Sequence, residues 1–258
     1  MIELDGLNSL HRATRAHFSQ VGIRSVEQVA ALTVEELCCF KHIGKVTAPA
    51  IHAQARAYLE NCPVIFGPLP GMCGDPVWYF DIETSPHTGR VWSIGWGRNR
   101  DDMQVVVLDE HRRRNETLPL PDGRAVILAS DGDEVWRVFA DAVCADDQPV
   151  LHWTGFDAGV MRSTAPADVI ERVDARLHDF HGSFKRAVQI PARGTSLKTV
   201  AAYFGFQWAA YTDWFMAWSD YRAWISSGNT AHLARACSYQ LDDVRAMIVV
   251  AAWVAEQR

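Results

Sequence analysis

Two carboxylates stand two residues apart in an otherwise apolar segment, residues 78–84 (WYFDIET). The apolar and aromatic character of this segment predicts a β-strand, in which Asp81 and Glu83 leave the same face about 7 Å apart. Two ionised groups on one face of a buried strand carry a high desolvation cost unless a cation compensates them. Carboxylate oxygens are the ligands that Mg²⁺ and Mn²⁺ prefer. The pair therefore predicts a divalent metal site, and the alternative is a solvent-facing edge strand.

A metal held by strand carboxylates needs ligands from elsewhere in the chain, and two further acids are candidates. Asp157 follows the apolar segment 149–153, and sites in open α/β sheets assemble beyond the ends of strands. Its alternative role is to cap the next helix. Asp243 lies one helical turn after Tyr239, so a phenol and a carboxylate point toward the same neighbour. Here the alternative is a surface acid beside a packed tyrosine, and the helical period leaves open whether Asp242 or Asp243 points inward.

The elements that would position these residues follow from hydrophobic period and turn residues. Apolar segments of strand length predict strands at residues 77–84, 91–97, 103–108 and 149–153. Short turns join the first three as an antiparallel meander. Helices are predicted at 133–144 and from residue 154 to the end, the last at 231–256 with Asn229 as its cap. This order predicts an α/β fold in which a mixed sheet is flanked by helices.

A break in composition divides the chain into two parts. Residues 63–76 contain four prolines and three glycines, which preclude regular structure. We therefore expect a small all-α domain at 1–62, a linker at 63–76 and the α/β domain at 77–258. Within the first part the pattern predicts short helices at 7–21, 26–32, 33–40 and 47–60. Thr33 and Glu36 have the spacing of a capping box.

The formal charge of −6 over 258 residues argues against a protein that coats nucleic acid with a broad basic surface. Phosphates can still be bound by backbone N–H groups, by helix N-termini and by cations held on carboxylates. No stretch reaches the about 18 apolar residues of a membrane span. The first residues lack the basic and apolar segments of a secretory signal, so we expect a cytoplasmic protein with no membrane partner.

Two weaker signals concern contact with nucleic acid. Residues 112–114 form a short basic run that could contact a phosphate backbone, although such runs are usually solvated turns. Among the ten tryptophans, Trp92, Trp96 and Trp153 could stack on bases, with core packing as the alternative. The aromatic residues at 208–224 are predicted to form a buried helical face.

The acidic segments, taken together, resemble the three exonuclease motifs of the DEDD, or DnaQ-like, superfamily, which has an RNase H-like fold. Phe80-Asp-Ile-Glu83, then Phe156-Asp157, then Tyr239-x-x-x-Asp243 occur in the family's order on the expected strand, strand end and helix. The tyrosine in the third motif resembles the DEDDy branch. Residues 196–206 also resemble the segment between the second and third motifs.

This resemblance implies a metal-dependent nuclease that hydrolyses phosphodiester bonds by a two-metal mechanism. Asp81, Glu83, Asp157 and Asp243 would bind two Mg²⁺ or Mn²⁺ ions, and Tyr239 would orient the attacking water. The family's usual activity is 3'-5' exonucleolytic, and we favour DNA over RNA as the substrate polymer.

One departure from the family concerns substrate contacts. An Asn usually precedes the second motif, and this chain has His152 or Thr154 near that place. We count His152 and Lys198 among the residues expected to contact nucleic acid. The rival interpretation is a non-catalytic nucleic-acid-binding or adaptor protein on an RNase H-like scaffold. Retention of all the acids favours the enzyme, because buried carboxylates without a metal are costly. Internal cleavage of a structured substrate is a third alternative.

The N-terminal helices resemble a helix-hairpin-helix module. Residues 32–51 match its spacing, with a tight turn at Ile43 and Gly44. Such hairpins bind phosphates through backbone N–H groups without reading sequence. The resemblance implies that Ile43, Gly44 and Lys45 contact nucleic acid. The module usually has a second glycine two residues before Gly44, where this chain has His42, and the alternative is a helical docking domain.

Overall fold

The computed structural model describes residues 2–8, 10–74, 76–111 and 116–258. The chain folds into two compact units. The first comprises Met1–Gly71, His181–Gly205 and Arg258, and the second comprises Met72–Phe180 and Phe206–Gln257. Residues 181–205 group with the N-terminal residues, a grouping for which the sequence offered no signal.

The second unit is built on a seven-stranded mixed sheet in the order β5-β6-β4-β3-β2-β7-β8. Its strands are β2 (Trp78–Thr84), β3 (Val91–Gly97), β4 (Met103–Leu108), β5 (Thr117–Pro119), β6 (Ala125–Ala129), β7 (Val150–His152) and β8 (Leu177–Asp179). β3 is antiparallel to both β2 and β4, which confirms the predicted meander. β7 runs parallel to β2 and to β8, and β6 runs parallel to β4. The mixed sheet with its helices confirms the predicted fold class.

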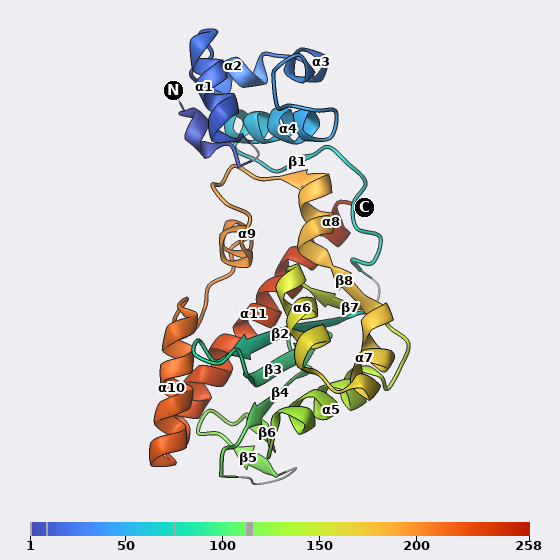
Figure 1. Ribbon diagram of the computed structural model, residues 1–258, viewed down its shortest axis with the longest axis vertical. Coiled ribbons are helices and arrows are strands. Elements are labelled where there is room, and N and C mark those ends of the chain that lie inside the picture. The colour runs from blue at the N-terminus through green and yellow to red at the C-terminus, as the bar shows by residue number, and fades with distance from the viewer. Residues whose placement is uncertain (1, 9, 75, 112–115) are drawn as a thin grey trace. The chain divides into compact units, whose positions relative to one another are not determined.

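Helices cover both faces of this sheet (Figure 1). They are α5 (Gly132–Val143), α6 (Gly155–Thr164), α7 (Ala167–Val173), η2 (Asp174–Arg176), α10 (Trp214–Ser227) and α11 (Thr230–Glu256). Phe80 of β2 packs on Phe139 of α5 with ring centroids 4.9 Å apart, whereas the next residue, Asp81, is hydrogen-bonded to Gln240 of α11. Because successive residues of a strand point to opposite faces, α5 and α11 lie on opposite sides of the sheet. α10 packs along α11.

Some predicted elements of the second unit are wrong. The chain after residue 154 is not helical throughout, since β8 adds a strand beside β7. Residues 208–213 are not helical, and α10 begins at Trp214. Trp214 and Phe215 are 46% and 52% exposed, so the predicted buried face is wrong at these two positions. Trp92, Trp96 and Trp153 are buried, in agreement with the core-packing alternative.

The first unit is mainly helical. Its elements are η1 (Leu4–Gly6), α1 (Arg12–Gln20), α2 (Val26–Ala30), α3 (Val34–Cys38), α4 (Thr47–Glu60), all but the first residue of α8 (Phe180–Ala187), α9 (Leu197–Tyr203), β1 (Val64–Ile65) and β9 (Val188–Gln189). The capping box is confirmed, because Glu36 N donates to Thr33 Oγ1 at 3.1 Å and Thr33 N donates to Glu36 Oε2 at 2.7 Å. α4 has the predicted bounds.

Residues 181–205 are tied to the N-terminal helices by specific contacts. Residues 64–65 pair with residues 188–189 as strands, so the prediction of no regular structure at 63–76 is wrong there. Gln54 of α4, fully buried, donates from Nε2 to the Ala192 carbonyl at 3.2 Å. Asn8 Oδ1 accepts from Gly194 N at 2.6 Å. These contacts make one folded unit from two separate stretches of chain.

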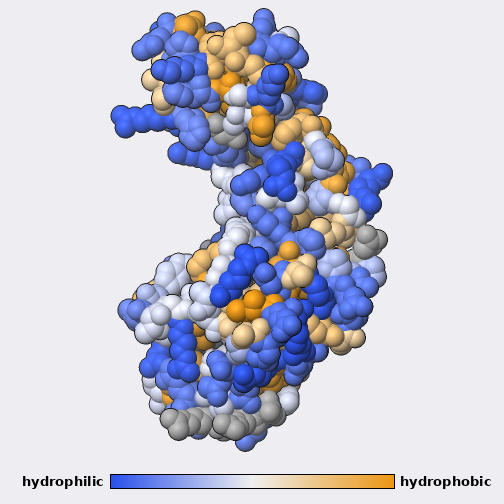
Figure 2. All heavy atoms as spheres, turned by 45° about the vertical axis from the view of Figure 1, so that its right-hand side comes forward, coloured by the Kyte–Doolittle hydropathy of each residue, from blue (hydrophilic) through white to orange (hydrophobic). Residues whose placement is uncertain are grey.

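Hydrophilic residues cover most of the face seen in Figure 2, with scattered apolar patches between them. Within the described ranges, no helix is both long and apolar enough to cross a bilayer.

Candidate metal centre

Three carboxylates converge in the second unit. Asp81 and Glu83 come from one face of β2, and Asp243 comes from α11. One oxygen of each lies within 4.8 Å of the other two. Glu83 and Asp243 are each 7% exposed, and Asp81 is half-buried. The structure thus brings together three of the four acids singled out in the sequence.

Asp157 stands beside this cluster, in the first turn of α6. The N-cap of that helix is Thr154, whose side chain accepts from Phe156 N, so Asp157 is not the N-cap residue. Its carboxylate still contributes to the cap, because it accepts a hydrogen bond from the Thr154 backbone N–H. The side chain is buried, and its negative charge raises the pKa of Asp81. A position in the first turn also sets the carboxylate near the positive end of the helix dipole.

The acids raise one another's pKa values. Burial, and then the charges of Asp243, Asp157 and Glu83, raise the pKa of Asp81 well above its usual value, against a hydrogen bond from Gln240 that lowers it. Burial raises the pKa of Asp157 to about 7. Buried acids this close together resist joint ionisation unless positive charge is added. An all-oxygen donor set with excess negative charge fits a hard divalent cation, and these residues could hold one.

Gln240 orients Asp81, a role that sequence reasoning missed. The amide is fully buried, and its Nε2 donates to Asp81 Oδ2 at 2.8 Å. Gly95 pairs with Asp81 across the β2–β3 ladder, and a Cβ at Gly95 would lie 2.8 Å from Gln240 Cγ. Gly95 therefore makes room for the amide. The available signal was a polar residue between apolar neighbours on the last predicted helix, since a buried amide needs a partner.

Asp243 is held by Trp208, whose indole Nε1 donates to Oδ1 at 2.7 Å. Asp242 points elsewhere: it accepts from Ala209 N at 2.8 Å and pairs with Arg245 at 2.8 Å. The choice between the two adjacent acids, which the helical period left open, therefore falls on Asp243. Trp208 belongs to the irregular segment before α10. A helix was predicted there, so its hydrogen bond to Asp243 could not be anticipated from the sequence.

Tyr239 is buried next to the cluster, one turn before Asp243. Burial, followed by the negative charges of Asp243 and Glu83, raises the pKa of its phenol. The group therefore stays protonated and acts as a hydrogen-bond donor. Its ring lies against Tyr211 with centroids 5.7 Å apart, and Tyr211 donates to Asp220 Oδ2 at 3.2 Å. The tyrosine pair fixes the position of the Tyr239 ring.

His152 is buried at the end of β7. Its Nδ1 is hydrogen-bonded to the Thr154 carbonyl, and its ring meets Phe80 edge-on with centroids 6.0 Å apart. Burial lowers the pKa of the imidazole, so the ring is neutral at pH 7. A contact between His152 and a bound strand stays a prediction, and it would require the buried ring to move.

The other predicted contact residues lie in the first unit. Ile43 is buried, whereas Gly44 and Lys45 are exposed on the turn between α3 and α4, where Gly44 N donates to Thr47 Oγ1 at 3.3 Å. Lys198 is half-buried on α9. The basic run at 112–114 lies outside the residues that the structure describes.

A family model described as the RNase H superfamily matches residues 78–255, more than half of the chain. The match begins at β2 and ends on α11, and so includes every carboxylate described above. The chain therefore belongs to the RNase H superfamily. A search of curated proteins found no match, and neither did a search of solved structures.

Proposed function

We propose that this protein is a metal-dependent nuclease that hydrolyses phosphodiester bonds, as a 3'-5' exonuclease of the DEDDy type acting on DNA. The observation that carries the proposal is the convergence of Asp81, Glu83 and Asp243, with Asp157 beside them, inside an RNase H superfamily domain. The raised pKa values of Asp81 and Asp157 support it, because such a cluster is costly unless cations compensate it.

The four acids would hold two Mg²⁺ or Mn²⁺ ions, and the neighbouring side chains keep them in place. Bound ions would supply the Lewis acidity that activates water and stabilises the leaving oxygen. Gln240 and Trp208 hold the carboxylates of Asp81 and Asp243 in fixed orientations. Hydrogen bonds from groups outside the ligand set tune metal affinity in this way.

Tyr239 would position the attacking water. Because its phenol stays protonated, it can donate a hydrogen bond to the water but cannot remove a proton from it. The packing against Tyr211 holds the hydroxyl in one place. Tyr239 is therefore an orienting donor in this proposal and not the general base.

The helices at 32–51 form the proposed helix-hairpin-helix module, which would contact the nucleic-acid backbone through Gly44 and Lys45. The support is local. A Cβ at Gly44 would meet nothing within 4 Å, so the turn is open, and Lys45 is exposed beside it. Lys198 of the same unit would add a phosphate contact. These contacts carry no sequence information.

The test is a cleavage assay with end-labelled single- and double-stranded DNA and RNA in Mg²⁺ or Mn²⁺. We expect the DNA to shorten progressively from its 3' end with release of nucleoside monophosphates, and EDTA to stop the reaction. Asp81→Asn keeps the side-chain shape but removes the charge, and should lower the rate at least about 100-fold. Cleavage that persists unchanged in this variant, or that needs no metal, would overturn the proposal.

Two adjacent residues of α11 provide a matched comparison. Asp243→Asn removes a cluster carboxylate, whereas Asp242→Asn changes a buried acid that points to Ala209 and Arg245. Loss of cleavage in the first variant with activity retained in the second is the expected pattern. Equal losses would contradict the assignment of Asp243 over Asp242.

A further inference from the structure

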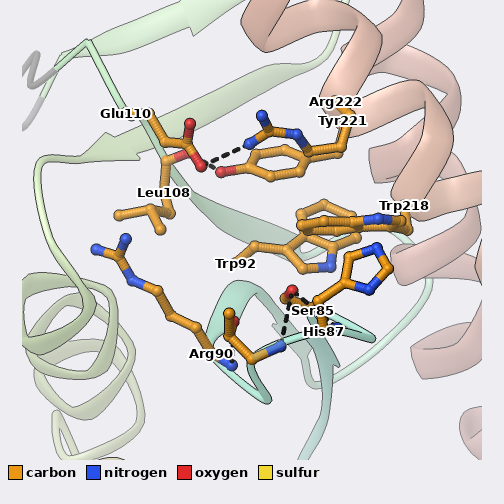
Figure 3. Close-up of a pocket in the computed structure, with 10 residues that line it drawn as sticks. Ser85, His87, Arg90, Trp92, Leu108, Glu110, Trp218, Tyr221 and Arg222 are labelled. Carbon is orange, nitrogen blue, oxygen red and sulfur yellow. Dashed lines mark hydrogen bonds and ion pairs between the residues drawn. The ribbon is translucent and has the colours of Figure 1, made fainter.

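A cavity of about 320 Å³ lies at the end of the sheet where β2 and β4 terminate, and one side of α10 closes it (Figure 3). Ser85 and Leu108 line it from the ends of the two strands, and Trp218 and Tyr221 line it from the helix. Its volume is near the lower limit of ligand cavities, which suits one planar ring with its sugar and excludes a duplex.

The aromatic side chains of the cavity form a continuous wall. Trp92 stacks on Tyr221 with centroids 4.5 Å apart and planes 23° apart, and Trp218 lies 5.5 Å from Tyr221. Trp218 is half-buried, with His87 edge-on to its ring and the Arg222 guanidinium 5.7 Å from the ring centroid. Stacking on such rings is the general way in which proteins hold unpaired bases, and it tolerates any base because every base has a π face.

The wall contains a hydrogen-bond donor without an acceptor. Trp92 is 1% exposed, and its indole Nε1 has no partner within the described part of the chain. Figure 3 shows this ring nitrogen on the side of the cavity where Ser85 and His87 stand. A buried N–H without an acceptor is costly. Because this nitrogen has almost no accessible surface, Trp92 offers the cavity its apolar ring and no hydrogen bond.

The rim of the cavity carries net positive charge. Arg222 pairs with Glu110 at 2.7 Å, which leaves Arg90 as a second, exposed cation. Over the ranges that the structure describes, Arg90 forms no ion pair. A guanidinium in that position suits a phosphate group, for which Arg has the matching donor geometry.

We propose that this cavity binds one unpaired nucleobase of the substrate strand, stacked on Trp218, with a neighbouring phosphate at Arg90. The inference rests on the proposed nuclease function, because it places the base on the strand that the metal centre cuts. The metal centre and the cavity lie at the same end of β2. Ser85, which lines the cavity, follows Glu83 by two residues, a backbone span of at most about 7 Å. The enzyme would accordingly favour single-stranded or frayed ends.

The test compares two short, fluorescently labelled single-stranded DNAs of equal length, one with bases and one in which abasic sites replace them. Both carry the same backbone charge, so any difference in affinity comes from the bases. Fluorescence anisotropy in EDTA measures binding without cleavage. We expect the intact protein to bind the base-containing strand about tenfold more tightly, the scale of one stacked base.

Four variants identify the residues responsible. Trp218→Ala should remove the preference for bases and leave affinity for the abasic strand unchanged, whereas Trp218→Phe, which retains a ring, should keep most of it. Phe215→Ala is the control, because Phe215 is exposed on the same helix and does not line the cavity. Arg90→Gln should weaken binding of both strands and reduce its salt dependence by about one ion.

Equal binding of the two strands by the intact protein would overturn the base site, whatever the variants do. A preference that survives in Trp218→Ala would also overturn it, since the bases would then be held elsewhere. Cleavage in Mg²⁺ is scored separately. An intact protein that cuts DNA but ignores its bases would refute the cavity proposal alone, and one that binds bases but never cuts would refute the nuclease proposal alone.

Discussion

The carboxylate of Asp81 is oriented by the side-chain amide of Gln240. The Gln240 amide donates its N–H to one carboxylate oxygen, and the stabilisation of the charged form counteracts part of the effect of burial on the pKa of Asp81. The amide can reach β2 only because residue 95 has no side chain. Three residues, Asp81, Gln240 and Gly95, thus act as one structural group.

Replacing Gln240 with Leu should weaken metal binding without unfolding the protein. Leu has a similar volume and removes the donor to Asp81, so the Mg²⁺ concentration for half-maximal cleavage should rise about 10- to 100-fold, the usual effect of losing such a partner. Titration of cleavage rate against Mg²⁺ measures it. An unchanged titration would show that Gln240 is only a packing residue.

Gly95→Ala should disturb the contact between Gln240 and Asp81 from the β3 side. The added Cβ would displace a fully buried Gln240, so we expect a loss of about 1–3 kcal/mol in unfolding free energy together with a higher Mg²⁺ requirement. The control is Gly159→Ala on α6, where a Cβ would meet nothing within 4 Å. Its unfolding free energy should not fall.

At the scale of elements, the first unit contains a turn held in an unfavourable conformation. His42, which stands where the helix-hairpin-helix pattern has a glycine, has φ of 70°. This is the left-handed region that side chains with a Cβ disfavour. The backbone of the turn thus has, at His42, a conformation suited to glycine.

His42→Gly should therefore stabilise the protein by about 1 kcal/mol, measured by urea unfolding. Asn61→Gly is the comparison, because Asn61 ends α4 with φ of 48° and Asn tolerates this region better. Its gain should be only a few tenths of a kcal/mol. A loss of stability in His42→Gly would mean that the imidazole makes a contact worth more than the strain.

Elements with a strong hydrophobic period were predictable. β3, β4 and α4 have the predicted bounds, and the strand that carries Asp81 and Glu83 differs by one residue. β8 was missed because three residues are too few to show a period, and its pairing with β7 is set by distant sequence. The aromatic composition of residues 208–213 is typical of a core face and favours a helix, although the segment is irregular. The position of Trp208 on Asp243 depends on tertiary contacts, as does the grouping of residues 181–205.

At the scale of the whole molecule, the acid cluster links stability to pH. The pKa of Asp157 is raised to about 7 and that of Asp81 also lies above its usual value, whereas both are near 4 in an unfolded chain. Between these values the folded protein holds more protons than the unfolded chain. The stabilising contribution of the protonated acids is therefore complete below about pH 4 and is lost as pH rises through about 7.

In EDTA, the melting temperature should fall between pH 5 and pH 8 through this effect. Mg²⁺ or Mn²⁺ should restore the melting temperature, and more at pH 8 than at pH 5. An ion at a hundredfold excess over its dissociation constant should raise the unfolding free energy by about 2.7 kcal/mol. Circular dichroism melts measure both. Asp157→Asn, which cannot ionise, should show a shallower dependence on pH in EDTA. The same metal effect at both pH values would contradict the linkage.

The interrupted path of the chain has a consequence for how this protein can be divided. The first unit needs residues 181–205 as well as the N-terminal stretch, and Gln54 and Asn8 bond to that later stretch. Because its residues come from two separate stretches of the chain, the first unit could not be added or removed at a single junction. A fragment beginning at residue 77 would carry residues 181–205 without the helices they pack on, and a fragment ending at residue 62 would lack one side of its own fold.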